Sequence, residues 1–132
     1  MYLLIWIFKI MDLPQIILLL IIGLAAGFVS GSMGVGGGII IVPALVFLLG
    51  FSQHEAQGTS LGVLVFPVVF LGAFQYYKKG YVDIKFVLIL ALAFILGGYL
   101  GSLVAVHLPD RLLRKIFGFL VFLASLKMIF GK

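Results

Sequence analysis

The chain has 132 residues, of which 64% are hydrophobic and only 10% are charged, and its mean hydropathy is +1.37. Soluble domains carry about 25% charged residues, so this composition excludes an ordinary soluble domain and predicts a polytopic membrane protein. The net charge of +5 comes from short basic clusters between apolar runs, a pattern that sets membrane topology and argues against nucleic-acid binding. The absence of cysteine excludes disulfides and cysteine metal sites.

The N-terminal segment, residues 1–10, is apolar and aromatic but too short to cross a bilayer. It has no basic region before its apolar run and no small-residue cleavage site, so it does not match a cleaved signal peptide. Tyr2 and Trp6 suit the headgroup region, which favours an interfacial anchor; the alternative is the first turns of the next helix.

The first membrane span is expected at residues 14–30, with Pro14 as a natural helix start. Gly23, Gly27 and Gly31 recur every four residues and make a flat stripe on which another helix can approach closely. Packing within one subunit and packing at a dimer seam both fit this stripe.

A glycine-rich break follows this span. Five of the fourteen residues from Ser30 to Pro43 are glycine, and each costs a helix about 1 kcal/mol relative to alanine. In a bilayer, open backbone is tolerated only where it is buried in protein or lines a polar cavity, and broken helices often mark a transporter's substrate site. Free amides at such a turn favour an anion, whereas the alternative is a close backbone crossing that binds nothing. The segment matches neither of the nucleotide-binding glycine motifs.

The remaining apolar segments complete the predicted bundle. Residues 39–51 would cover only about 20 Å, so they form either a short span or a re-entrant half-helix, with Pro43 in its first turns. Further spans are expected at residues 60–77, 86–108 and 111–130, the first interrupted by Pro67. The fourth segment carries a second stripe of small residues, namely Ala93, Gly97, Gly101 and Ala105.

The predicted fold class is therefore all-α, a single membrane domain over residues 1–132 with four or five transmembrane helices and a glycine-rich break after the first. With four spans, the basic residues divide six to three and place both termini in the cytoplasm. With five spans, which we favour, they divide four to five. Such a chain could insert in both orientations and pair antiparallel, like the inverted repeats of larger transporters.

Catalysis is poorly supported by the sequence. The four carboxylates are not paired at short spacing, and His54 and His107 show no metal-ligand spacing, so we predict no catalytic residue, metal or cofactor. The neighbours His54 and Glu55 could relay protons if they face a cavity; otherwise they form a solvated turn.

A short polar motif, Gly58-Thr59-Ser60, precedes the span at residues 60–77. Serine and threonine cap helices well, which is the structural explanation. The functional one is that the two hydroxyl groups help to hold a polar solute near the glycine break. The two explanations are compatible.

Several motifs along the chain together point to one family: G-L-A-A-G-F-V-S-G-S-M-G-V-G-G-G-I-I-I-V-P, then A-Q-G-T-S-L, then G-Y-V-D-I-K, and later L-P-D-R-L-L-R-K-I-F-G. They closely resemble the TauE/SafE family of sulfite and organosulfonate exporters over residues 13–130. The resemblance implies a multi-pass permease of the cell membrane for small sulfur-containing anions. By position, it implies substrate binding at Gly31, Gly34, Gly36, Gly37, Gly38, Pro43, Gly58, Thr59 and Ser60.

One departure from the family pattern concerns length. Family members usually hold two such repeats, whereas this sequence holds one, so we expect a half-size member or a fragment of a longer protein. One repeat leaves a wall of a central site missing, so a homodimer is expected. The predicted partners are a small inorganic or organic anion, the lipid bilayer and a second copy, with no nucleic acid. The alternatives are a non-transporting membrane assembly subunit and a passive anion channel.

Overall fold

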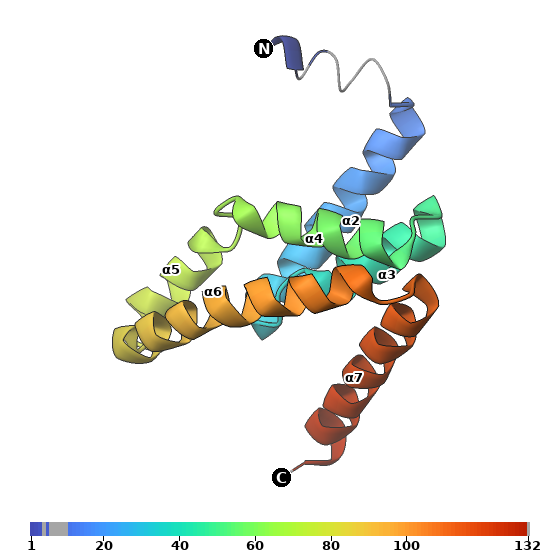
Figure 1. Cartoon of the computed structure of the whole chain (residues 1–132). Helices are drawn as coiled ribbons and strands as arrows, with labels where there is room; N and C mark the ends of the chain where they lie inside the picture. The colour runs from blue at the N-terminus through green and yellow to red at the C-terminus, as the bar shows by residue number, and fades with distance from the viewer. Residues whose placement is uncertain (4, 6–10, 132) are drawn as a thin grey trace.

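The computed structural model describes residues 1–3, 5 and 11–131. From Leu13 onward these residues form six helices joined by short turns, with no strand among them (Figure 1). The helices are α2 (Leu13–Met33), α3 (Gly38–Leu49), α4 (Gln53–Val65), α5 (Phe70–Lys78), α6 (Ile84–His107) and α7 (Asp110–Phe130). The predicted all-helical class is confirmed. The interfacial anchor expected at residues 1–10 falls mainly on residues 4 and 6–10, which lie outside the described residues.

Two of these helices, α2 and α6, are each long and apolar enough to cross a membrane, with a mean hydropathy of 2.4. The pair α4 and α5 provides a third crossing if the two bent helices act as one span. Helix α3 has only 12 residues, about 18 Å, and is too short to cross alone. The count of four or five spans stays a prediction.

The glycine-rich break predicted after the first helix is present. Helix α2 ends at Met33 because Gly34 adopts the left-handed conformation, with φ of 68°, and donates its N–H to the carbonyl of Ser30 at 2.8 Å. Gly36, with φ of 72°, turns the chain a second time, and α3 begins at Gly38. Left-handed backbone strains any residue with a Cβ, which explains why both turning positions are glycine.

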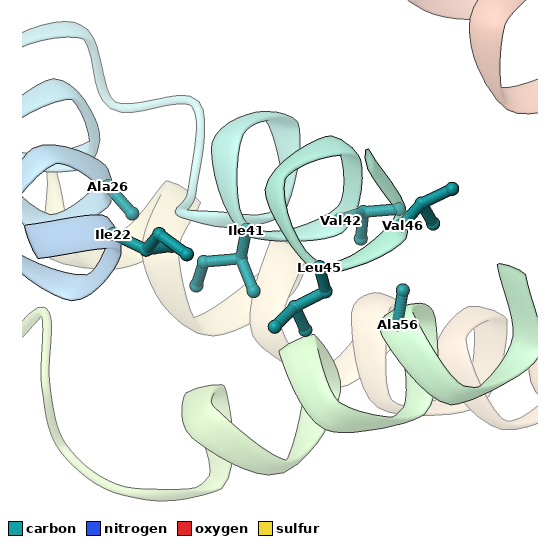
Figure 2. Packing of buried hydrophobic residues seen from close by; sticks show 7 residues of the cluster. All are labelled: Ile22, Ala26, Ile41, Val42, Leu45, Val46 and Ala56. Atoms are coloured by element: carbon teal, nitrogen blue, oxygen red, sulfur yellow. The ribbon is translucent and has the colours of Figure 1, made fainter. Parts of the chain in front are cut away.

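The short helix α3 lies at the centre of the fold, packed between α2 and α4. Its buried face carries Ile41, Val42, Leu45 and Val46, which meet Ile22 and Ala26 of α2 and Ala56 of α4 (Figure 2). Leu45 is only 2% exposed and Ala56 is fully buried. This small cluster is the main apolar core of the described chain and fixes the glycine break against its neighbours.

Helix α4 begins at Gln53, seven residues before the start expected from the polar composition of residues 52–60. The reason is a capping box: the Ser52 hydroxyl accepts the Glu55 backbone N–H at 3.1 Å, and the Glu55 carboxylate accepts the Ser52 N–H at 2.8 Å. Helix α4 ends at Val65 because Phe66 is extended, as a residue before proline prefers. The next helix, α5, leaves at an angle of 53°.

Helices α6 and α7 are joined by a sharp turn, and α7 runs from that turn away from the other helices (Figure 1). Helix α6 buries no residue, and a Cβ at Gly97 or Gly101 of its stripe of small residues would meet no atom within 4 Å. Helix α7 buries only Leu113 and contacts α4. The core therefore consists of α2, α3 and α4.

Candidate functional site

A cavity of about 740 Å³ lies beside the glycine break, lined by α2, α3, α4, α5 and the turn between α2 and α3. Most of the lining is apolar or glycine. The side chains in it that carry hydroxyl groups are Ser30, Thr59 and Tyr76. The cavity brings together five of the residues that the family resemblance singles out: Gly31, Gly34, Gly36, Gly37 and Thr59.

The glycine stripe of α2 forms one wall of this cavity. A Cβ added at Gly23 or Gly27 would meet nothing within 4 Å, because the stripe faces open space and not a packed helix. At Gly31 the wall closes, since a Cβ at Gly72 of α5 would lie 3.8 Å from the Gly31 Cα. Within the chain, the stripe therefore provides room for a solute along most of its length and a close helix contact at its end.

The break contains backbone donors beside the cavity. Within the described part of the chain, the N–H groups of Val35, Gly36 and Gly37 have no backbone acceptor. The N–H groups of Gly38 and Ile39, which open α3, lack intrahelical partners as all helix starts do. Gly36 and Gly37 line the cavity, so free donors and the positive end of the α3 dipole lie at its wall.

The remaining predicted residues hold the break in place or lie away from it. Ser60 is 4% exposed, and a Cβ at Gly38 would lie 3.3 Å from its Oγ, so Ser60 packs against the first residue of α3. Pro43 lies inside α3, where the lining does not reach it. Gly58 is exposed on α4 and is likewise outside the lining.

Two of the three hydroxyl-bearing lining residues, Ser30 and Tyr76, are not among the site residues predicted from the sequence. Ser30 lies four residues after Ala26 on the inward face of α2, and this spacing was the signal that could have found it. Tyr76 is followed in the sequence by a second tyrosine and two lysines, a pattern typical of a membrane interface. In the structure it lines the cavity and donates its hydroxyl to the carbonyl of Ser32 at 3.3 Å.

The electrostatics of the cavity come from dipoles alone. Its lining contains no aspartate, glutamate, lysine, arginine or histidine. In the part of the chain that the structure describes, no group of three metal-ligating side chains occurs either. The polar groups that the lining offers are thus neutral N–H and O–H groups.

His54 and Glu55, which from the sequence could form either a proton relay or a solvated turn, lie outside the cavity lining. The Glu55 carboxylate is engaged by the Ser52 N–H at 2.8 Å in the capping box. The His54 ring lies between Asp110 Oδ1, at 2.9 Å, and the carbonyl of Ala105, at 3.0 Å. Both residues therefore stabilise the start of α4 in this structure.

The comparison with known proteins covers nearly the whole chain. The sequence profile of a family described as "Sulfite exporter TauE/SafE" matches residues 13–132. A "Probable membrane transporter protein" of Haemophilus influenzae is 34% identical over 120 residues, covering 86% of this chain and 46% of the relative.

Two further relatives show the same relation. A "Probable membrane transporter protein" of Xylella fastidiosa is 31% identical over 123 residues, and the match covers 92% of this chain and 47% of that relative. The "Probable membrane transporter protein YunE" of Bacillus subtilis is 33% identical over 120 residues, and the match covers 86% of this chain and 44% of that relative. The chain therefore spans about half the length of these relatives. No solved structure matches it.

Proposed function

Because this chain belongs to the sulfite exporter TauE/SafE family, we propose that it is half of a multi-pass permease of the cell membrane for small sulfur-containing anions such as sulfite or sulfonates. The observation that carries this proposal is the set of unpaired backbone amides at the wall of a cavity with no charged side chain. The matched relatives named as probable membrane transporters agree with a transport role.

The chemistry of the wall selects for negative solutes. The N–H groups of Gly36 and Gly37 donate, and the α3 dipole adds a partial positive charge, so an oxyanion gains hydrogen bonds where a cation would meet repulsion. A hydrogen bond to a charged partner contributes about 1.5–3 kcal/mol, so two or three such donors suffice to hold a small anion reversibly. The Thr59 hydroxyl supplies a further donor.

The complete carrier, in our proposal, contains two copies of this chain. The chain spans about half of its matched relatives, and its longest helix, α6, buries none of its residues within the described chain. A second copy would provide the second half, and the nearly even division of basic residues between the two sides permits an antiparallel pair. Subunit counting by single-molecule photobleaching in nanodiscs should give two copies per particle. Transport by particles that contain one copy would overturn the homodimer.

The transport proposal is tested by flux of radiolabelled sulfite in proteoliposomes. The Gly37→Leu change introduces a side chain at a cavity-lining glycine whose Cβ would already lie 3.0 Å from Ile41 Cδ1, so flux should fall at least tenfold. The matched control is Gly62→Leu on α4, where a Cβ meets nothing within 4 Å and the cavity is not touched; flux should be unchanged. Equal flux in both variants would contradict the proposal that the glycine break is the substrate site.

The same assay separates the alternative functions. A carrier saturates with substrate, whereas a passive channel conducts linearly and gives single-channel currents in planar bilayers. A membrane assembly subunit would show no flux alone and would purify with another polytopic chain.

A further inference from the structure

Helix α5 is attached to the rest of the fold by a bend and by very few contacts. It has nine residues and buries none of them. The bend of 53° between α4 and α5 lies at Pro67, which lacks an N–H and holds the preceding Phe66 in an extended conformation. A segment with little buried surface beyond a helix break is drawn from the low-stability end of a fold.

Two contacts hold α5 against α2. The first is the close approach of the two backbones at Gly31 and Gly72, where a Cβ on Gly72 would lie 3.8 Å from the Gly31 Cα. The second is the hydrogen bond from the Tyr76 hydroxyl to the Ser32 carbonyl at 3.3 Å. Ser32 lies in the last turn of α2, where the helix leaves carbonyl groups without intrahelical donors, so Tyr76 supplies a partner that the chain break has removed.

We propose that α5 is a gate over the cavity and that the Tyr76–Ser32 hydrogen bond holds this gate closed. Five lining residues come from the bend and from α5, namely Val68, Val69, Gly72, Ala73 and Tyr76, so a swing about Pro67 removes that wall of the cavity. The role of the gate in passage of a solute rests on the proposed function, but its closure concerns the chain alone. A single neutral hydrogen bond with a 44% exposed tyrosine is weak enough to open reversibly.

The gate can be measured without any substrate, because the chain has no cysteine and two introduced cysteines are therefore unique. Spin labels at Met33→Cys and Lys79→Cys report the separation of the α2 and α5 ends by pulsed EPR in nanodiscs. Both positions are exposed and neither lines the cavity. In this background, Tyr76→Phe should raise the population of long distances roughly two- to tenfold.

The matched control is Tyr77→Phe. Tyr77 is 54% exposed and its hydroxyl makes no hydrogen bond among the described residues, so the distance distribution should stay that of the unmodified background. A distribution that is the same in Tyr76→Phe and in the background would overturn the latch.

A second pair of variants tests the close approach independently of the hydroxyl. Gly72→Leu should wedge α5 away from Gly31 and lengthen the label distance, whereas Gly72→Ala places its Cβ at an ordinary contact distance of 3.8 Å and should not. An unchanged label distance in Gly72→Leu would contradict the proposed contact of the gate with α2 at Gly31.

Flux measurements on the same proteins distinguish failure of the gate from failure of the proposed function. Label distances that lengthen in Tyr76→Phe, in a chain that moves no sulfite, would support the gate and reject the transport proposal. Normal sulfite flux with unchanged label distances would support the transport proposal and reject the gate.

Discussion

Asp110 Oδ1 accepts two hydrogen bonds from one residue, His54: its backbone N–H at 3.0 Å and its ring Nδ1 at 2.9 Å. The two residues are 56 positions apart, and their contact ties the N-terminus of α4 to the turn between α6 and α7. The carboxylate faces the positive end of the α4 dipole, which is the favourable arrangement. Since α6 buries no residue, this junction is a main attachment of the C-terminal helix pair to the core.

The first prediction concerns this junction. Asp110→Asn removes the charged acceptor that both His54 donors share, so the melting temperature in detergent should fall by roughly 2–5 °C. Asp12→Asn is the matched control, because Asp12 precedes α2 without a side-chain capping bond and its replacement should leave the melting temperature unchanged. Equal melting temperatures in the two variants would contradict a stabilising role for the junction.

The second prediction is a pH dependence. Hydrogen bonds from the backbone N–H groups of Gln53 and His54 lower the pKa of Asp110 below its ordinary value of 3.8. A lowered pKa means that the stabilisation is fully present above pH 3.8 and is lost as the pH falls through the folded-state value. The difference in melting temperature between the parent protein and Asp110→Asn should therefore shrink as the pH falls below 3.8. A difference that grows on acidification would give the opposite sign and reject this explanation.

The third prediction concerns the core. Leu45→Ala should reduce the free energy of unfolding by about 2–5 kcal/mol, because Leu45 is 2% exposed between α3 and its two neighbours. Leu48→Ala on the same helix is the control: Leu48 is 60% exposed, so its truncation should cost much less. Denaturant unfolding followed by helix content measures both changes. Similar losses in the two variants would mean that α3 is not the centre of the core.

The fourth prediction concerns backbone conformation in the break. Gly36→Ala should destabilise the protein by about 1–2 kcal/mol, because φ is 72° there and a left-handed residue with a Cβ is strained. No atom lies within 4 Å of the added Cβ, so the cost is conformational and not steric. Gly36→Asn should recover part of the loss, since asparagine tolerates this conformation. If alanine and asparagine behave alike in thermal unfolding, the strain argument fails.

The fifth prediction concerns affinity. Thr59→Val keeps the shape of a cavity-lining side chain and removes its hydroxyl, so the half-saturating sulfite concentration should rise about threefold to tenfold. The control is Ser102→Ala, because the Ser102 hydroxyl is on α6 and bonds only the Tyr99 carbonyl of its own helix. Flux measured over a range of sulfite concentrations should give an unchanged half-saturating concentration in the control. A rise of the same size in Ser102→Ala would mean that the loss of any hydroxyl has this effect, and would contradict a specific role for Thr59.

The features that could be predicted from the sequence are local ones. The run of apolar residues gave the helices, and the glycines at positions 34 and 36 gave the break, because each of these depends on a residue and its near neighbours. Pro67 likewise predicted an interruption of the span at residues 60–77, although not the angle of the bend. The early start of α4 was missed because the Ser52–Glu55 capping box lies within a stretch whose polar composition resembles a loop.

Long-range relationships could not be predicted in this way. Nothing near His54 in the sequence indicates Asp110 as its partner, so His54 and Glu55 suggested a proton relay or a solvated turn and not an attachment point. Tyr76 is a residue type that is common at membrane interfaces. Only the bend at Pro67 brings it to the end of α2. The glycine stripe of α2 suggested a helix seam, but which helix faces it depends on how the core packs.

The neutral lining of the cavity bears on the energy source of transport. An anion held only by the amide and hydroxyl groups that this chain contributes would keep its full charge while it crosses, because the lining from this chain contains no side chain that could neutralise it. Each monovalent anion would then carry current, and a membrane potential of 100 mV, negative inside, would favour its exit by about 2.3 kcal/mol. In a resting cell the voltage itself would push such a solute outward, without any second substrate.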